Sequence, residues 1–181
     1  MIPTNLNIDD LLILCKKDNR LAQAEIYDRY QRAMFNVSVR IVKDPDEAED
    51  VMQESFITAF DKLESFKGEA PFGAWLKRIV INKSLNHLKK SEKYAMLSEK
   101  NLRNLADESY ELDEEDYSKI KAAKVMESLA KLHTSYNRIL TLHLIEGYDY
   151  EELCEILNIS YTNCRTLISR AKDSLRKQLT L

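Results

Sequence analysis

Glycine and proline, the residues that most often interrupt a helix, are scarce in this chain. There are three of each in 181 residues, whereas apolar residues are spread evenly and make up 44% of the sequence. Charged residues supply a further 31%, a composition that indicates a water-soluble helical protein. Modules of about 60 to 70 residues bury only a modest core, and the chain is long enough for two of them. We therefore predict an all-α fold of two small helical modules.

Three properties of the sequence bear on the compartment. No apolar run approaches the roughly 20 residues that span a bilayer, so we expect no membrane insertion. The first ten residues include acidic side chains, whereas a signal peptide starts with basic ones. Cys15, Cys154 and Cys164 are odd in number and lie at apolar positions of expected helices, which is typical of free thiols in a reducing compartment. We expect a cytoplasmic protein without disulfides.

Apolar residues recur every three or four positions in the first half of the chain, the spacing of one helix face. Successive stripes consist of Tyr27, Tyr30, Met34, Val37 and Ile41; of Ala48, Met52, Phe56, Ala59 and Leu63; and of Leu76, Ile79, Leu85 and Leu88. Asp44 and Pro45 can start the second helix, with Glu47 reaching back to complete a capping box. Residues 66–73 hold two glycines and a proline and are predicted to form a loop, with the third helix running from about residue 72 to residue 90.

The C-terminal part shows the same periodicity. Its apolar positions are Ala122, Val125, Leu129 and Leu132, then, after a break near residues 133–136, Leu140 and Leu144, with Gly147 ending that helix. Asp149 and Glu152 form a predicted capping box for a short helix that ends before Asn158. Asn158 tolerates the left-handed conformation of a tight turn, and Ser160 can cap a final helix that runs toward Leu179.

Residues 93–118 are acidic, weakly periodic and poor in large apolar residues, which predicts a linker between two packed domains. We accordingly expect a domain over residues 1–92, a linker over residues 93–118 and a domain over residues 119–181.

The formal net charge is −3, although phosphate contacts need lysine and arginine. The charges are segregated along the chain, however: residues 44–54 and 94–118 are acidic, and residues 66–93 and 160–181 are basic. This alternation predicts two DNA contacts and at least one contact to a basic protein surface. For any single block, a solvated helix face remains the alternative.

Residues 149–177 have the pattern of a helix-turn-helix: a short helix, a tight turn and a longer basic helix. Such a unit lays its second helix in the major groove of DNA. One face of that helix carries Arg165, Thr166, Ser169 and Arg170. Arginine can pair with guanine through two hydrogen bonds, and hydroxyls can bond to either type of base. A two-helix corner with a polar outer face gives the same pattern, so a purely structural role is the alternative.

A second cluster of aromatic, basic and amide residues surrounds the predicted loop. It comprises Phe66, Lys67, Phe72, Trp75, Lys77, Arg78, Asn82, Lys83 and Asn86, followed by His87. Unstacked bases bind flat apolar rings and their backbone binds cations, so this composition favours single-stranded DNA. For Phe72 and Trp75, which lie at helical spacing, a place in the core is the alternative.

Taken together, these segments resemble the extracytoplasmic-function (ECF) group of bacterial sigma factors, over roughly Ala24 to Leu179. Residues 48–56 are similar to the family's acidic helix that docks on the polymerase clamp. Residues 66–82 are similar to its promoter-melting segment, and residues 156–176 to its upstream-element reader. The resemblance implies a sigma factor that binds core RNA polymerase, recognises and melts promoter DNA and directs transcription initiation. It also implies that an anti-sigma factor is a candidate partner.

The resemblance further implies roles for individual residues. Contacts to the polymerase clamp fall to Asp50, Gln53 and Glu54. The loop over residues 66–73, which contains Phe66, Lys67 and Phe72, receives a flipped base of the minus-ten element. The junction of duplex and single strand is held by Trp75, Lys77, Arg78, Asn82, Lys83 and Asn86. The minus-thirty-five element is read by Arg165, Thr166 and Ser169, with Arg170 and Lys172 on phosphates. Asn158 departs from the family pattern, where glycine is frequent, and Leu167 and Ile81 replace frequently basic residues.

Two other classes of protein remain as alternatives. The main one is a helix-turn-helix regulator that binds its operator without polymerase. The second is an interaction adaptor whose basic faces bind acidic partners. We do not expect an enzyme, because His87, His133 and His143 are scattered and the sequence has neither a cysteine pair at metal-ligand spacing nor a glycine-rich phosphate loop. No metal and no cofactor are expected.

Overall fold

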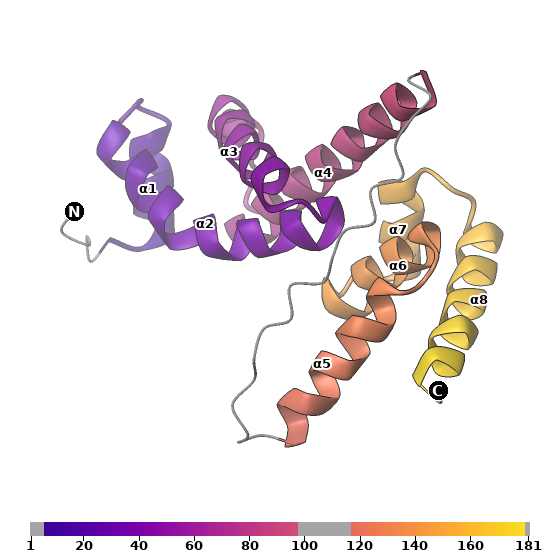
Figure 1. The fold of residues 1–181 in the computed structure, drawn as a ribbon. Coiled ribbons are helices and arrows are strands. Elements are labelled where there is room, and N and C mark those ends of the chain that lie inside the picture. Colours follow the sequence, from indigo (N-terminus) through magenta and orange to yellow (C-terminus); the bar gives the residue numbers. More distant parts are fainter. Residues whose placement is uncertain (1–5, 98–116, 180–181) are drawn as a thin grey trace. The chain divides into compact units, whose positions relative to one another are not determined.

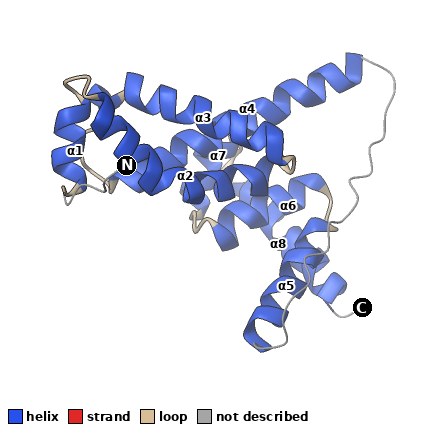
Figure 2. Ribbon diagram, turned by 60° about the vertical axis from the view of Figure 1, so that its left-hand side comes forward, coloured by secondary structure: helices blue, strands red, loops and turns tan. Residues whose placement is uncertain are grey.

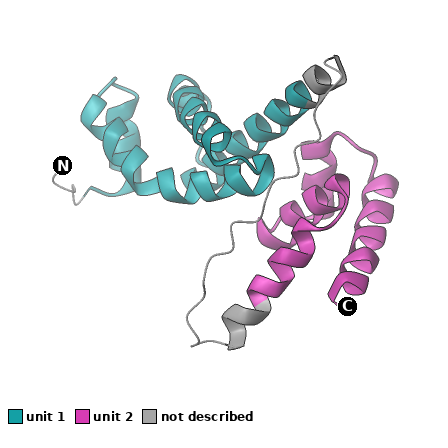
Figure 3. Cartoon of the chain, viewed as in Figure 1, with its two compact units in different colours: residues 1–100 teal, residues 101–181 magenta. Residues whose placement is uncertain are grey.

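In a computed structural model of the chain, residues 6–97 and 117–179 are described. The chain divides into two compact units, Met1–Lys100 and Asn101–Leu181, which are coloured separately in Figure 3. Every regular element in the described stretches is a helix (Figure 2), so the predicted all-α class is confirmed. No helix among the described residues has the length and apolar character that crossing a bilayer requires.

The described part of the first unit contains three long helices and one short helix, which Figure 1 labels. They are α1 (Ile8–Cys15), α2 (Arg20–Val42), α3 (Pro45–Asp61) and α4 (Phe72–Leu97), with a 3-10 turn, η1 (Leu63–Ser65), after α3. The sequence placed Cys15 on an apolar helix face, but the bounds of α1 were not predicted. The helix begins where Asn7 Oδ1 accepts a hydrogen bond from the Asp10 N–H at 2.8 Å. Leu11, Leu12 and Cys15 are buried and α1 packs on α2. The stability of a helix this short depends on its packing against the rest of the protein. The spacing of its apolar residues does not reveal that packing.

Helices α2, α3 and α4 pack on one another around the core of the first unit, and the stripe predicted for α3 is buried throughout. For α4 the prediction was only partly right. Its buried residues are Phe72, Leu76, Val80, Ile81, Ser84 and Leu85, whereas Ile79 and Leu88 are half-buried. Because α4 packs against both α2 and α3, it buries a wider face than one stripe. Ile81 therefore belongs to the core, and its departure from the family pattern does not affect a DNA-facing position.

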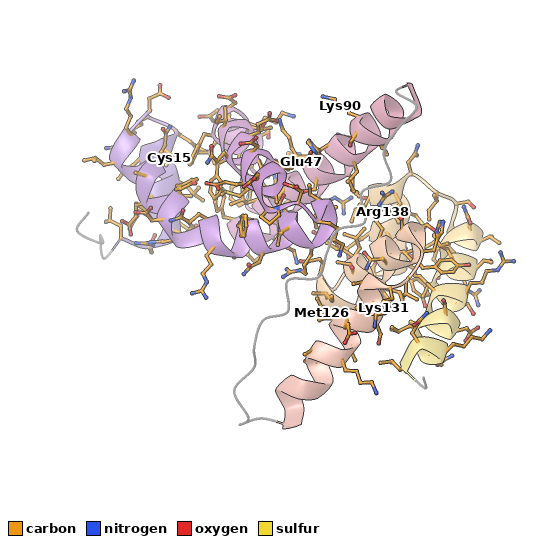
Figure 4. All side chains as sticks on the ribbon, in the orientation of Figure 1. Cys15, Glu47, Lys90, Met126, Lys131 and Arg138 are labelled. Atoms are coloured by element: carbon orange, nitrogen blue, oxygen red, sulfur yellow. The ribbon has the colours of Figure 1, made fainter. Side chains whose placement is uncertain are left out.

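The turn between α2 and α3 contains half of the predicted capping box. Asp44 Oδ1 accepts a hydrogen bond from the Glu47 N–H at 2.9 Å, and Pro45 occupies the first turn of α3. The Glu47 side chain, labelled in Figure 4, is engaged elsewhere, because its Oε2 lies 2.9 Å from His87 Nε2 on α4. Glu47 therefore links α3 to α4.

The second unit consists of α5 (Tyr117–Ala130), α6 (Thr134–Leu140), a π-helical turn η2 (Thr141–Ile145), α7 (Tyr150–Leu157) and α8 (Tyr161–Leu179). Two predicted core positions are wrong. Ala122 is exposed, and Leu144 is 49% exposed whereas Leu142 is fully buried. The π turn is wider than an α-helical turn. The α-helical spacing, when extended beyond Leu140, therefore predicts the wrong residue as buried.

The local signals around α7 and α8 are confirmed. Asp149 Oδ1 accepts a hydrogen bond from the Glu152 N–H at 2.8 Å. In return, Glu152 Oε2 accepts one from the Asp149 N–H at 3.0 Å, which completes the predicted capping box. Asn158 ends α7 in the left-handed conformation, with φ 54°. Ser160 Oγ accepts a hydrogen bond from the Asn163 N–H at 3.3 Å. These caps fix the corner between α7 and α8.

We expect Asp149→Ala to destabilise the second unit by about 1 kcal/mol, because the substitution removes the N-cap acceptor of α7. Urea unfolding of the whole chain, followed by circular dichroism, measures this change. Glu151→Ala is the matched control, since Glu151 is an exposed neighbour that is not the cap. Equal unfolding free energies for the two variants would contradict the role of the cap.

The predicted linker, residues 93–118, lies mostly outside the described residues, which exclude residues 98–116. Its two ends are helical, because α4 continues to Leu97 and α5 begins at Tyr117. The continuation of α4 has a local cause. Residues 91–97 contain glutamate, lysine, alanine, methionine and leucine without glycine or proline, and these residues have a high helix propensity.

The three cysteines are free, as predicted. Burial raises the pKa of the Cys15 thiol to about 11. Burial, together with the neighbouring Cys154, likewise raises the pKa of Cys164 to about 11. Both thiols are therefore protonated near neutral pH and pack as small apolar groups.

Candidate nucleic-acid interface

Helix α8 has an apolar and a polar face. The apolar face is buried and consists of Cys164, Ile168, Ala171 and Leu175. The polar face forms a shallow groove of about 420 Å³, lined by Tyr161, Thr162, Arg165, Thr166, Ser169 and Arg170, which we call the reading groove. Lys172 is half-buried further along the helix. The structure thus brings together four of the five residues predicted to read bases or bind phosphates, those at positions 165, 166, 169 and 170. An exposed helix lined with cations and hydroxyls suits the major groove of DNA.

The two arginines of the reading groove differ from the one near the end of α8. Arg176 Nη1 lies 2.7 Å from Asp173 Oδ1. Among the described residues, neither Arg165 nor Arg170 forms such an ion pair, and both are exposed. Their guanidinium groups therefore retain their donors for an acceptor outside the protein.

The Thr166 hydroxyl is already used as a donor. Its Oγ1 donates to the Thr162 carbonyl oxygen at 2.9 Å, a common arrangement for threonine inside a helix. The acceptor capacity of Oγ1 and the methyl group remain for a ligand. Thr166 is therefore suited to accept a hydrogen bond from the amino group of adenine or cytosine.

Our sequence analysis missed two residues of the reading groove, Tyr161 and Thr162. Both are exposed and lie in the first turn of α8. Their position directly after the Ser160 cap was the available signal, since the first residues of a recognition helix face the base edges.

Phe66, Phe72 and Trp75 form one aromatic cluster at the start of α4. The ring centre of Phe66 lies 5.2 Å from that of Trp75 and 5.7 Å from that of Phe72. Phe72 also packs edge-on against Tyr30 of α2, at 5.5 Å. Because Phe72 is only 4% exposed, its ring is not available to a base, contrary to our prediction, and it supports the other two rings instead. Phe66 and Trp75 are half-buried.

Two glycines shape the approach to this aromatic cluster. Gly68 has φ 76°, a conformation that glycine adopts without strain. At Gly73 a Cβ atom would lie 2.9 Å from Cε1 of Tyr30, so the absence of a side chain allows Tyr30 to lie against the first turn of α4. Helix α4 begins at Phe72, where the sequence predicted its start, so Gly73 lies in the first turn of the helix.

The polar residues predicted to bind the minus-ten DNA lie beside the aromatic cluster and along α4. Lys67, Asn82 and Asn86 are exposed, and Lys77, Arg78 and Lys83 are half-buried. Lys83 Nζ lies 3.3 Å from Glu54 Oε2 of α3. The sequence predicts that Glu54 binds polymerase and that Lys83 binds DNA. In the structure the two side chains pair with each other. Exposed ion pairs of this kind contribute at most about 1 kcal/mol, so either residue can exchange its partner at little cost.

The predicted polymerase-binding residues Asp50, Gln53 and Glu54 are exposed on α3. Ile57 lies one turn beyond Gln53, is 62% exposed and was not singled out from the sequence. Its spacing places it on the same side of the helix. Acidic residues around an exposed aliphatic side chain are typical of a protein-binding surface, whereas they would repel DNA phosphates.

Comparison with known proteins covers both units. The family model for Sigma-70 region 2 matches residues 26–94, and the model for Sigma-70, region 4 matches residues 122–175. The RNA polymerase sigma-H factor of Pseudomonas aeruginosa is 30% identical over 165 residues, covering 83% of this chain and 82% of that relative. The ECF RNA polymerase sigma factor SigW of Bacillus subtilis is 29% identical over 187 residues, covering 91% of this chain and 92% of that relative.

Solved structures share the fold. The sigma factor RpoE in complex with the anti-sigma factor NepR from Bartonella quintana matches with a TM-score of 0.62 and 20% identity, over 87% of this chain and 96% of that chain. CnrH in complex with the cytosolic domain of CnrY matches with a TM-score of 0.57 and 22% identity, over 96% of this chain and 98% of that chain. At these identities the likeness concerns the fold alone.

A chain whose described elements are all helices, and in which a region 2 unit precedes a region 4 unit, is a sigma factor of the sigma-70 class. Its relatives narrow the class further: the protein belongs to the ECF group of sigma factors. It binds core RNA polymerase and directs that enzyme to promoter DNA at transcription initiation. Proteins of this class are initiation factors rather than enzymes.

Proposed function

We propose that the two units divide the work of promoter recognition. Residues 1–92 dock on polymerase and open the minus-ten element, residues 119–181 bind the minus-thirty-five element, and residues 93–118 link the two through a basic channel of the enzyme. The observation that carries this proposal is the sorting of charge on exposed helices, acidic on α3 and basic on α8. A basic protein surface attracts the first and DNA phosphates attract the second.

In this proposal Asp50, Gln53 and Glu54 contact the coiled-coil clamp helices of polymerase. Their exposure on one side of α3 supports this role. Glu54 exchanges Lys83 for a basic residue of polymerase, and Lys83 then becomes available to a DNA phosphate. The exchange is feasible because the Glu54–Lys83 pair is itself exposed to solvent, with 66% of the Glu54 side chain accessible.

Opening of the minus-ten element uses binding energy and no ATP. Phe66 and Trp75 offer ring surface for unpaired bases, and the buried ring of Phe72 packs against both of them. A flipped base enters the loop around Gly68, at an unstacking cost of a few kcal/mol. Stacking on aromatic rings, contacts from Lys67 and the lysines of α4, and the contacts to polymerase together offset that cost.

We expect Trp75→Ala to weaken capture of the melted strand by about 1 kcal/mol, near the low end for a stacked base because the ring is half-buried. Permanganate reactivity of unpaired thymines in the open complex measures the effect. Trp75→Phe, which keeps a flat ring, is expected to retain most of the signal. The interpretation fails if Trp75→Ala reduces binding to polymerase without DNA to the same extent, because the defect would then lie in folding.

At the upstream element Arg165, Thr166 and Ser169 read base edges, and Arg170 and Lys172 bind phosphates. The reading groove supports this assignment for the first four of these residues, because it presents them on one exposed face. Lys172 is half-buried and extends the same basic face further along α8.

We also propose that the protein acts in the cytoplasm, where promoter DNA is found, and that an anti-sigma factor masks its two units. The second point is supported by the fold it shares with RpoE of Bartonella quintana, which was solved bound to the anti-sigma factor NepR.

In vitro transcription with core polymerase and a pool of random promoters tests the proposed function. We expect RNA only from templates that share two short sequence elements at a fixed spacing. Deletion of residues 119–181 is expected to remove the requirement for the upstream element together with most of the activity. No RNA above the level of core polymerase alone would contradict the proposal.

A further inference from the structure

Tyr161 is the first residue of α8 and lies between two grooves of the second unit. On one side it lines the reading groove with Thr162 and Arg165. On the other it lines a groove of about 430 Å³ together with His143, Asp149, Tyr150 and Glu151. The side chain is 49% exposed. Neither the apolar stripes nor the basic residues of the sequence indicated a role for it.

The Tyr161 ring is supported on its inner side. It packs edge-on against Tyr150, with 6.2 Å between ring centres. Tyr150 in turn packs on His143 at 5.3 Å, and His143 Nδ1 lies 2.9 Å from the Tyr148 carbonyl oxygen. A ring held by this chain of contacts loses little further freedom on binding a ligand, and its outer side is left at the surface.

The chemistry of the reading groove identifies what that outer side can bind. The other lining residues are arginines, threonines and a serine, which bind the polar atoms of base edges. Tyr161 supplies the large apolar contact in this groove. In the major groove of DNA the one apolar group on a base edge is the C5-methyl of thymine.

The charge of the second groove makes a DNA phosphate an unfavourable ligand for Tyr161. This groove carries the carboxylates of Asp149 and Glu151, which repel phosphate oxygens. The first residues of a recognition helix also face bases rather than backbone. We propose that Tyr161 is a specificity-determining residue that packs on the C5-methyl group of a thymine in the upstream promoter element. This inference rests on the proposed reading of that element by α8.

Thymine-to-deoxyuridine substitution tests the inference, because it removes the methyl group and leaves every hydrogen bond of the base pair intact. Each thymine of the upstream element, on both strands, is replaced in turn in a promoter that the protein uses. Run-off transcription with core polymerase is then measured for the unaltered protein, for Tyr161→Ala and for Tyr161→Phe, which keeps the ring. The exposure of Tyr161 makes both variants compatible with the fold.

We expect one thymine at which deoxyuridine lowers transcription about fourfold, the factor that corresponds to one buried methyl group. The loss is expected for the unaltered protein and for Tyr161→Phe, and is expected to vanish for Tyr161→Ala. The inference is overturned if no thymine is sensitive, or if Tyr161→Ala retains the same sensitivity. Arg165→Ala separates this failure from that of the proposed function, because unchanged transcription by that variant would show that α8 does not read the element.

Discussion

Replacing Asp50 and Glu54 together by lysine is expected to abolish binding to core RNA polymerase while the first unit remains folded. Both carboxylates are exposed on α3, so the core does not depend on them. In the complex, the two lysines would face a basic surface, and the juxtaposition of like charges costs several kcal/mol, on the order of 2–5. Affinity measurements with immobilised core polymerase, together with thermal unfolding of the variant, check both parts.

A charge-matched control separates a local effect from an effect of net charge. Asp28 on α2 and Glu64 in the turn after α3 are also exposed, and their joint replacement by lysine changes the net charge by the same amount. This control is expected to retain most of the affinity for polymerase. Unchanged co-purification of the Asp50 and Glu54 variant with polymerase would show that α3 is not the docking surface.

Arg165→Ala is expected to reduce recognition of the upstream element by about 1–3 kcal/mol, the range for a lost bidentate contact to guanine. The side chain is exposed in the reading groove, so its loss removes a contact to DNA without opening the core. Run-off transcription on promoters altered at one base at a time measures the effect. One base position is expected to lose its influence on the Arg165→Ala variant.

The pattern of the loss distinguishes two roles for Arg165. A uniform reduction across all promoter sequences would indicate a phosphate contact and contradict base reading. Arg176→Ala is the control, because Arg176 lies near the end of α8 and is engaged by Asp173. Its substitution is expected to have a small effect that does not depend on the promoter sequence.

Features that depend on residues close together in the sequence were predicted best. The capping box of Asp149 and Glu152 and the left-handed Asn158 are determined within a few residues of chain, so they could be recognised without the fold. The exposed face of α8 followed from helical spacing once that helix was placed. The resemblance to ECF sigma factors also covers α8, through its segment over residues 156–176.

Features that depend on packing between helices were predicted less well. The burial of Phe72 depends on Tyr30, more than forty residues earlier, and a spacing pattern does not reveal that contact. Core residues of α4 were misassigned because the helix is covered from two sides. The pairing of Glu54 with Lys83 was missed because each had been considered only with an external ligand. Tyr161 was missed because an exposed aromatic residue at the start of a helix fits neither an apolar stripe nor a basic block.

We propose that the two units act on one promoter only when polymerase holds them. With a net charge of −3, the chain by itself is expected to have little affinity for DNA. The most direct measurement is the fluorescence anisotropy of a labelled promoter fragment, titrated with the protein alone and with the protein bound to core polymerase. We predict weak binding without sequence preference for the protein alone, and tight binding that requires both promoter elements for the complex. Tight, sequence-specific binding by the protein alone, as expected of a stand-alone helix-turn-helix regulator, would contradict the claim.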